Sequence, residues 1–414
     1  MRAKTAMYQL ICRTCHKPVD DRSATACPQD GGILNVVYAS PEIPVDPALP
    51  GIWRYAAHLP LDDSAHIVSL GEGGTPLLRS AHLGAAQGLD NLYFKNDSLN
   101  PTGSYKDRIS SVGISQLVEQ GKDTWVSTSS GNAGASTAAY GVRAGVQGYL
   151  FTLERAPRAK IGQIIAYGPT LRSVRGLGYD PAVEDATWAN CAQLCQSRGW
   201  MMTITACSFS PLAMEGAKTI AYEICESLGS VPPDAVYVPV GGGGLLTMIH
   251  KGFQEWRDAG YIDRVPRMVS VQALGCDAVT QAWDKGSSMQ ALDDCTSMVS
   301  GIILTNPPDG ELVLEALRDS NGWAVSVTDD ATYQAQEELA SQEGLFVEPA
   351  AAVTWGAIKA DRQSGRLMSD DVVVALLTGV GFKDSAAVQR MTEHVDLPLI
   401  EASEILTVDQ STPG

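Results

Sequence analysis

One turn of this chain has the sequence Asn100-Pro101-Thr102-Gly103-Ser104-Tyr105-Lys106-Asp107-Arg108. It lies between a strand-like run, Leu92–Lys95, and a segment with helical periodicity, Ile109–Gln120. Lysine side chains are mostly exposed, so a lysine in a first helical turn is ordinarily solvated. A lysine that points into a cleft has a lowered pKa and becomes a nucleophile that forms Schiff bases. The residues that the fold brings to Lys106 decide between these two interpretations.

Length and composition indicate a globular protein with two or three subdomains, because 414 residues exceed what one core usually holds. The net charge of −17 opposes binding to a phosphate backbone, which requires a basic surface. We find no pattern of a signal peptide or a membrane-spanning run, and expect a cytoplasmic protein without nucleic-acid or membrane partners. Six of the nine cysteines lack the spacing of a disulfide framework, which also fits a reducing cytoplasm. These six are Cys191, Cys195, Cys207, Cys225, Cys276 and Cys295.

The first forty residues form a segment of a different kind. Cys12-Arg13-Thr14-Cys15 and Cys27-Pro28-Gln29-Asp30 have the layout of the two knuckles of a zinc ribbon. Asp30 stands where a fourth cysteine is usual, and His16 is a spare candidate ligand. Two interpretations stay open: a metal site formed by Cys12, Cys15, Cys27 and Asp30, or a degenerate ribbon that folds by packing alone. The segment has no basic stripe, which argues against a role in nucleic-acid binding.

From residue 91 onward, strand-like runs alternate with segments of helical periodicity. This alternation predicts mostly parallel sheets with helices on both faces, and an active site at the carboxyl ends of the strands. The strand-like runs are 92–95, 124–127, 148–152, 170–174, 200–205, 235–240, 268–273 and 372–377, and the helical segments include 109–120, 133–144, 181–198, 214–228 and 245–260. Three further loops at strand ends therefore accompany the turn that carries Lys106.

The second loop, Ser129–Gly134, places hydroxyl groups and glycine at a helix N-terminus. Free N–H groups there form a cradle for a carboxylate, and the Asn132 amide adds a donor for a phenolic oxygen. Ordinary N-capping explains the same residues.

The third loop, Gly241–Gly244, follows an apolar strand and has neither the Walker nor the Rossmann spacing. Four glycines before a helix predict a cradle for a monophosphate.

The fourth loop, Leu377–Asp384, presents the neutral hydroxyl of Thr378 at the end of a very apolar strand. Together the four loops offer an amine, a carboxylate cradle with an amide, a monophosphate cradle and a hydroxyl. Pyridoxal 5′-phosphate requires this set, because it has an aldehyde, a phenolic oxygen, a phosphate and a ring nitrogen. We therefore expect pyridoxal phosphate as the cofactor.

The chain resembles threonine synthase and its relatives among the pyridoxal-phosphate enzymes of fold type II, the tryptophan-synthase-β type. The matching motifs are Gly71–Leu77, Glu215–Thr219, Glu348–Ala350 and Thr378–Asp384, in addition to the loops above. The resemblance implies an α/β fold with two open, mostly parallel twisted sheets and helices on both faces, plus a small N-terminal zinc-ribbon-like extension. It also implies a homodimer.

The resemblance also implies a division of the chain into parts. Residues 1–40 are the degenerate zinc-ribbon-like segment, and 41–105 are a connector with the first part of the large cofactor domain. Residues 106–200 are a small, mobile α/β domain. Residues 201–414 complete the large domain and carry the phosphate cradle.

Residue roles follow from the same resemblance. Lys106 is the Schiff-base lysine and the catalytic residue, Asn132 contacts the phenolic oxygen, and Thr378 is the partner of the ring nitrogen. A neutral partner of the ring nitrogen favours elimination or replacement over transamination. The remaining implied contacts are Ser129, Ser130, Gly131 and Ser208 with the substrate, and Gly241, Gly242, Gly243 and Gly244 with the cofactor phosphate.

The chain departs from the family where relatives hold the phosphate of O-phosphohomoserine. An asparagine is replaced by Cys207, an arginine by Ala213, and a threonine after the Ser-Gly-Asn triplet by Ala133. A phosphate without charged partners is disfavoured in a closed site. We therefore expect a lyase or synthase that acts at the β or γ carbon of an amino acid. The expected substrates include amino acids that carry no phosphate. Two alternatives stay open: a genuine threonine synthase with other phosphate partners, such as Arg155, Arg158 or Lys160, and a non-catalytic homologue.

Overall fold

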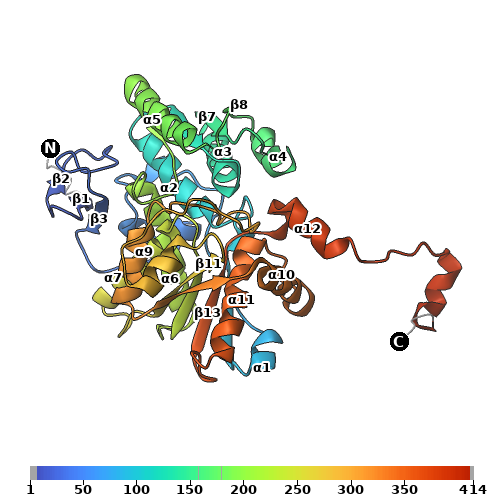
Figure 1. Cartoon of the computed structure of the whole chain (residues 1–414). Helices are drawn as coiled ribbons and strands as arrows, with labels where there is room; N and C mark the ends of the chain where they lie inside the picture. The colour runs from blue at the N-terminus through green and yellow to red at the C-terminus, as the bar shows by residue number, and fades with distance from the viewer. Residues whose placement is uncertain (1–6, 157, 179, 411–414) are drawn as a thin grey trace.

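The computed structural model describes residues 7–156, 158–178 and 180–410. Two α/β sheets lie side by side, with a small antiparallel unit at the N-terminal end and a helical tail that leaves the body at the C-terminal end (Figure 1). The large sheet has the order β12 (Trp323–Val327), β11 (Arg267–Ala273), β10 (Ala235–Pro239), β13 (Val372–Leu377), β5 (Asn91–Asn96) and β4 (Leu77–Arg79). The small sheet has the order β8 (Thr170–Ser173), β7 (Gln147–Thr152), β6 (Thr124–Thr128) and β9 (Met201–Met202).

Every neighbouring pair in the two sheets is parallel except the pair of β4 and β5. The expected fold class is therefore confirmed, and the structure adds β12 and β4 to the strands expected from sequence. The helices are α1 (Leu83–Gln87), α2 (Lys106–Glu119), α3 (Asn132–Ala144), α4 (Arg158–Tyr167), α5 (Pro181–Arg198), α6 (Pro211–Ser227), α7 (Gly244–Asp258), α8 (Ala278–Lys285), α9 (Gly310–Asp319), α10 (Asp329–Glu343), α11 (Pro349–Gln363) and α12 (Ser385–Thr392).

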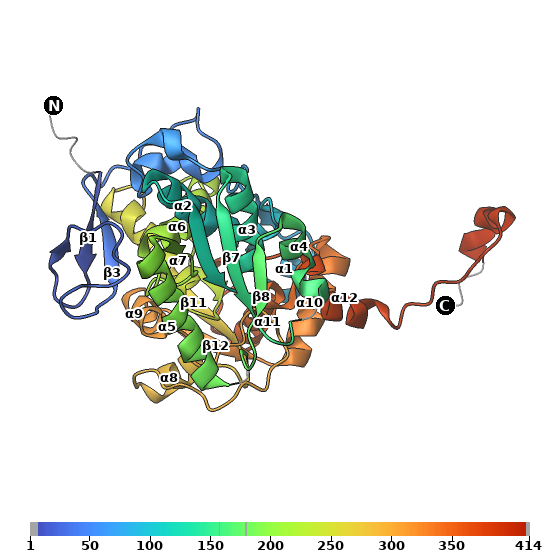
Figure 2. The same cartoon turned by 90° about the horizontal axis from the view of Figure 1, so that it is seen from above.

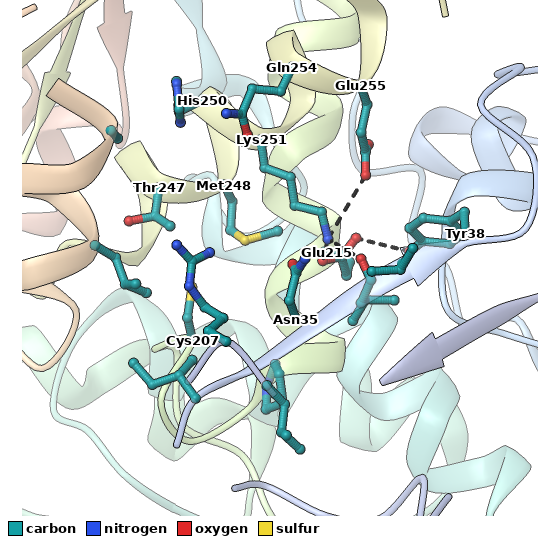
Figure 3. Close-up of a pocket in the computed structure, with 18 of the residues that line it drawn as sticks. Asn35, Tyr38, Cys207, Glu215, Thr247, Met248, His250, Lys251, Gln254 and Glu255 are labelled. Carbon is teal, nitrogen blue, oxygen red and sulfur yellow. Dashed lines mark hydrogen bonds and ion pairs between the residues drawn. The ribbon is translucent and has the colours of Figure 1, made fainter. Parts of the chain in front are cut away.

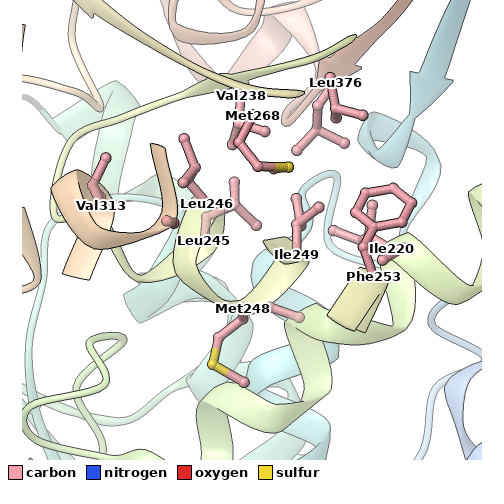
Figure 4. Packing of buried hydrophobic residues seen from close by; sticks show 14 of the residues in the cluster. Ile220, Val238, Leu245, Leu246, Met248, Ile249, Phe253, Met268, Val313 and Leu376 are labelled. Carbon is pink, nitrogen blue, oxygen red and sulfur yellow. The ribbon is translucent and has the colours of Figure 1, made fainter. Parts of the chain in front are cut away.

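The large sheet is covered on both faces, which explains why its central strands are apolar throughout. All residues of β10 are buried. Val236 and Val238 face α6, α7 and α9, where Ile249 and Phe253 lie in the same core (Figure 4). Tyr237 faces the opposite way and packs in a second core with α10 and α11. The alternation of side chains along one strand thus serves two hydrophobic cores.

The small sheet has its own core on the side of α3 and α4, built around Trp125, Leu150 and Tyr140. On its other face Val126 packs with Cys191 and Cys195 of α5. Figure 2 shows the small sheet from above, with α5 on one side of its strands. The exact domain limits given above stay a prediction.

The N-terminal unit consists of β1 (Tyr8–Cys12), β2 (Pro18–Val19) and β3 (Leu34–Tyr38), all antiparallel. We call residues 7–38 the ribbon. The Tyr38 hydroxyl donates to Glu215 over 2.9 Å, and the Lys251 amine donates to the Val36 carbonyl over 2.6 Å. A pocket of about 410 Å³ lies at this seam, and Figure 3 shows Lys251 between Glu215 and Glu255 in it. The ribbon is thereby docked on α6 and α7.

The structure corrects the expectation for two cysteines. Cys276 and Cys295 form a disulfide, with Cα atoms 4.7 Å apart, which joins the end of β11 to the loop before α9. Sequence spacing gave no sign of this pair because its geometry depends on the fold. Disulfides are unusual in a reducing cytoplasm, so the compartment stays a prediction. No helix among the described residues combines the length and apolar character that a membrane crossing needs.

Candidate active site

Lys106 is the first residue of α2, and the turn before it is tied to the fourth loop. Tyr105 N donates to the Thr378 carbonyl over 3.0 Å, and Val380 N donates to the Gly103 carbonyl over 3.0 Å. Gly103 has a φ of +85°, and a Cβ there would lie 2.8 Å from the Val380 side chain. A glycine is therefore required at this position. Two loops 270 residues apart in sequence meet as one unit beside Lys106.

The Lys106 amine is held against neighbouring side chains and is partly buried. Nζ lies 2.8 Å from the Thr205 hydroxyl oxygen and 4.7 Å from the centroid of the Tyr105 ring. Burial lowers the pKa of Lys106 to about 8, against the opposing effect of the Glu348 and Asp309 carboxylates. A neutral amine is thus available near neutral pH, as a nucleophile or base requires. The geometry therefore favours a Lys106 amine that is shielded from solvent and has a lowered pKa over an ordinary solvated lysine.

A buried ionic network fixes the first turns of α2. The Arg108 guanidinium bonds Asp97 over 2.8 Å and Glu223 over 2.6 Å, and Glu223 also accepts from Lys95 over 2.5 Å. Burial by itself lowers the pKa of Arg108, but the negative charges of Asp97 and Glu223 outweigh this effect and raise the pKa. Sequence reasoning missed Lys95, Asp97 and Glu223, because no local pattern shows that they meet. The network positions Lys106 from two residues away.

The second loop leads into α3, and its Ser129 hydroxyl bonds backbone groups at the start of that helix. Ser129 Oγ accepts from the N–H groups of Gly131 (3.3 Å) and Gly134 (3.1 Å), which is N-capping of α3. Ser130 Oγ accepts from Leu153 N over 3.1 Å. Gly131 and Asn132 are partly exposed and face the site. The capping hydroxyls order the loop whose backbone is proposed to bind a carboxylate.

Glu348 joins the second and fourth loops. Asn132 Nδ2 donates to this carboxylate over 3.0 Å, and Thr378 Oγ1 lies 3.4 Å from it. A Cβ on Gly379 would lie 2.4 Å from Glu348 Oε1, so a larger residue there would displace this carboxylate. The two side chains expected at one edge of the cofactor ring are therefore held together by one carboxylate. The Glu348–Ala350 motif had been matched to the family, without a role for Glu348.

The glycine cradle lies at the N-terminus of α7. Gly243 has a φ of +95°, while Gly241 and Gly242 are partly exposed. The backbone of Asp309 closes one side, because its N–H donates to the Gly242 carbonyl over 2.9 Å. A Cβ on Gly244 would lie 2.7 Å from Asp309 Oδ2. The cradle has the unobstructed backbone and the helix dipole that a monophosphate needs.

Asp309 also reaches the loop where the chain departs from its relatives. Its carboxylate accepts from Cys207 N over 2.7 Å and from Ser208 N over 3.0 Å. Burial raises the pKa of Asp309, and these two hydrogen bonds lower it. A carboxylate thus occupies two backbone donors on which an anionic ligand would otherwise depend. Sequence reasoning missed Asp309.

Comparison with known proteins identifies the family. The model of the pyridoxal-phosphate dependent enzyme family matches residues 68–379. Threonine synthase of Methanocaldococcus jannaschii is 35% identical over 393 residues, covering 92% of this chain and 95% of the relative. The chain belongs to the threonine synthase family of pyridoxal-phosphate dependent enzymes. Threonine synthase of Methanosarcina acetivorans is 33% identical over 397 residues, covering 94% of this chain and 95% of the relative.

The fold agrees with solved structures of the same class. The structure of maize serine racemase superposes with a TM-score of 0.64 at 22% identity, covering 77% of this chain and 92% of that one. Membership of the threonine synthase family makes the chain a pyridoxal-phosphate dependent enzyme acting on a small amino acid. The residues present fit the cofactor: the charges of Glu348 and Asp309 both act on the Lys106 amine, Glu348 contacts the Thr378 hydroxyl, and Asp309 bonds the backbone of the glycine cradle.

The ribbon brings its four candidate ligands together. The donor atoms of Cys12, Cys15, Cys27 and Asp30 all lie within 4.8 Å of one another. Cys15 Sγ and Cys27 Sγ are 3.8 Å apart, and Cys12 Sγ is 3.4 Å from Asp30 Oδ1. A tetrahedral zinc with bonds of about 2.3 Å places sulfurs roughly 3.8 Å apart. The donor set therefore fits zinc, and His16 is absent from the cluster.

Proposed function

We propose that this enzyme eliminates or replaces a β or γ substituent of an amino acid that carries no phosphate. One observation carries the proposal: the Asp309 carboxylate holds the N–H groups of Cys207 and Ser208. Beside them, Ala213 supplies no charge. A phosphate dianion placed there would meet a buried carboxylate and no arginine, and an unpaired buried anion is strongly disfavoured.

The residues of this chain divide the work. Lys106 attaches the cofactor through its aldehyde and moves the α-proton of the substrate as base and acid. The loop of Ser129, Ser130 and Gly131 holds the substrate carboxylate, and Ser208 contacts the side chain. Asn132 and Thr378 orient the ring, and the four cradle glycines hold the cofactor phosphate. When bound, pyridoxal phosphate stabilises negative charge at the α-carbon.

The polar contact of Thr378 favours elimination or replacement. A neutral hydroxyl does not hold a full positive charge on the ring nitrogen, and Glu348 lies beyond it, 3.4 Å from Thr378 Oγ1. Charge storage in the ring is then moderate, which suits passing electrons to a leaving group. This makes the reaction that of a carbon–oxygen lyase or a related synthase.

A second candidate is a threonine synthase that converts O-phosphohomoserine and water to threonine and phosphate. The 35% identity to the Methanocaldococcus jannaschii enzyme over most of both chains favours it. This second candidate requires that the phosphate of O-phosphohomoserine is bound by side chains at other positions than Cys207, Ala213 and Ala133. Arg155 and Arg158 are exposed near the start of α4, and the side chain of Lys160 lies outside the described residues.

A panel of amino acids, phosphorylated and not, added to the holoenzyme decides between the candidates. The absorption spectrum of the bound cofactor is recorded after each addition. We expect changes with non-phosphorylated β- or γ-substituted amino acids and none with O-phosphohomoserine. A wild-type enzyme whose cofactor spectrum responds to O-phosphohomoserine alone would instead be a threonine synthase. A chain that does not bind the cofactor would be a non-catalytic homologue.

We infer a homodimer that works in the cytoplasm, without nucleic-acid or membrane partners. Support for the dimer comes from the family, and the net charge of −17 supports the absence of nucleic acid. Sedimentation of the purified holoenzyme tests the oligomeric state, and a monomer at micromolar concentration contradicts the dimer.

A further inference from the structure

A cavity of about 790 Å³ lies between the ribbon, α2, α5 and the start of α6. Its walls include Trp188 and Phe209, whose ring centroids are 4.7 Å apart, and Met201 and Met202. This volume is in the range of sites that bind small organic molecules, and its apolar lining is typical of them. Apart from Ser208 and Ala213, its lining residues have no role in the site proposed above.

A second, much smaller void lies between this cavity and Thr205, the partner of Lys106. This void of about 10 Å³, roughly the space of one water, shares Gly113, Thr203 and Ala213 with the cavity. The void is also lined by Thr205, whose hydroxyl accepts from the Lys106 amine over 2.8 Å. Ala213 therefore lies between the large cavity and the reacting groups.

Small side chains keep this passage open. A Cβ on Gly113 would lie 3.1 Å from the Cβ of Ala213, so α2 and α6 approach closely with almost no side chain between them. A longer side chain at position 213 would fill the void and close off the cavity. An arginine at position 213 would be such a side chain.

Two neutral amide side chains that line the cavity have polar atoms without partners among the described residues. Gln116 Nε2 and Gln120 Oε1 are buried without a hydrogen-bond partner among the described residues. The Gln116 residue is 3% exposed. Unpaired buried donors and acceptors are unfavourable, which favours a ligand with hydrogen-bonding groups of its own. Of the charged lining residues, Arg22 is ion-paired with Asp62, and Lys122 interacts with Asp21.

We propose that the cavity beyond Ala213 receives the side-chain substituent of the amino-acid substrate, and that this substituent is an uncharged organic group with an apolar body. The inference rests on the proposed function, because it names the substrate class of the same site. Aromatic and thioether walls bind the apolar body, and Gln116, Gln120 and Ser208 bind its neutral polar atoms. Ala213 selects the substituent by leaving the passage open and uncharged.

Unreactive ethers of increasing length test this assignment. O-methyl-, O-propyl- and O-pentyl-serine and the matching homoserines are titrated into the holoenzyme, and cofactor absorption gives each Kd. Tryptophan fluorescence gives a second readout from the cavity, and Trp188→Phe identifies the signal of that residue. We expect binding to tighten about fourfold per added methylene, the value for burial of a CH₂ group. O-phosphohomoserine should bind more weakly than every ether.

Variants locate the binding site. Ala213→Met should remove the dependence on chain length and leave the methyl ether unaffected, while Ala213→Arg should also raise affinity for O-phosphohomoserine. Trp188→Ala should weaken only the long ethers, and so tests the cavity even if the Ala213 variants fold poorly. Ala360→Met, on an exposed position of α11, is the matched control and should change nothing.

The outcomes separate this inference from the function on which it rests. Equal Kd values for all ethers, or a length dependence that survives Ala213→Met and Trp188→Ala, would overturn the cavity assignment alone. Tighter binding of O-phosphohomoserine than of the ethers would overturn both it and the proposed substrate class. A cofactor spectrum that responds to no amino acid would overturn the proposed function itself.

Discussion

The Lys106 amine and the Thr205 hydroxyl oxygen lie 2.8 Å apart, at the meeting point of α2 and the loop after β9. Thr205 thus fixes the direction of the amine without carrying charge. We predict that Thr205→Val slows exchange of the substrate α-proton with solvent about tenfold, the effect of losing one such hydrogen bond. Thr205→Ser should restore the rate. Proton NMR in D₂O measures it, and an unchanged rate in Thr205→Val would show that the contact is incidental.

The lowered pKa of Lys106 predicts an unusual reactivity in the apoenzyme. With a pKa of about 8, the neutral fraction of the Lys106 amine rises as pH increases through 8, well below the pH at which an ordinary lysine loses its proton. Labelling by a dilute amine-directed reagent, followed by peptide mass spectrometry, should therefore be half-maximal near pH 8 at Lys106. An exposed lysine such as Lys285 is the internal control. Identical profiles for the two lysines would contradict the buried, desolvated environment.

The Arg108 network predicts a large stability effect away from the chemistry. Arg108→Ala leaves Asp97 and Glu223 buried without their partner, and the loss of one member of a buried pair costs about 3–5 kcal/mol. Chemical denaturation of the apoprotein should show this fall in unfolding free energy. The exposed pair of Arg257 and Asp258 is the matched control, and Arg257→Ala should have a much smaller effect.

The four donor atoms in the ribbon lead us to predict a bound metal that stabilises the ribbon and does not affect the cofactor. Purified protein should contain about one zinc per chain, because three thiolates and one carboxylate surround a common point. Removal of the metal, or Cys12→Ser, should lower the thermal midpoint of the ribbon and leave the visible absorption of the cofactor unchanged. Substoichiometric zinc in protein purified without chelator would support the alternative that the ribbon folds by packing alone.

Sequence predicted the parts of the site that are local, and missed those that depend on long-range contacts. The turn before Lys106 and the glycines before α7 are short patterns with a direct physical meaning, and both come directly before or at the start of a helix. Glu348 and Asp309 act from loops far away in sequence, and nothing in their neighbours shows where they point. The same limit applies to the pairing of Cys276 with Cys295. The altered position Ala213 was visible in the sequence, but the cavity behind it was not.

The Asp309 carboxylate occupies the N–H groups of Cys207 and Ser208, which we propose excludes a phosphorylated substrate, and the release of phosphate tests this proposal most directly. The measurement is inorganic phosphate formed from O-phosphohomoserine by the purified, pyridoxal-phosphate-loaded enzyme. We predict no release above that of a Lys106→Ala control. Efficient phosphate release by the wild-type enzyme, with threonine formed in equal amount, would contradict the account and identify the chain as a threonine synthase.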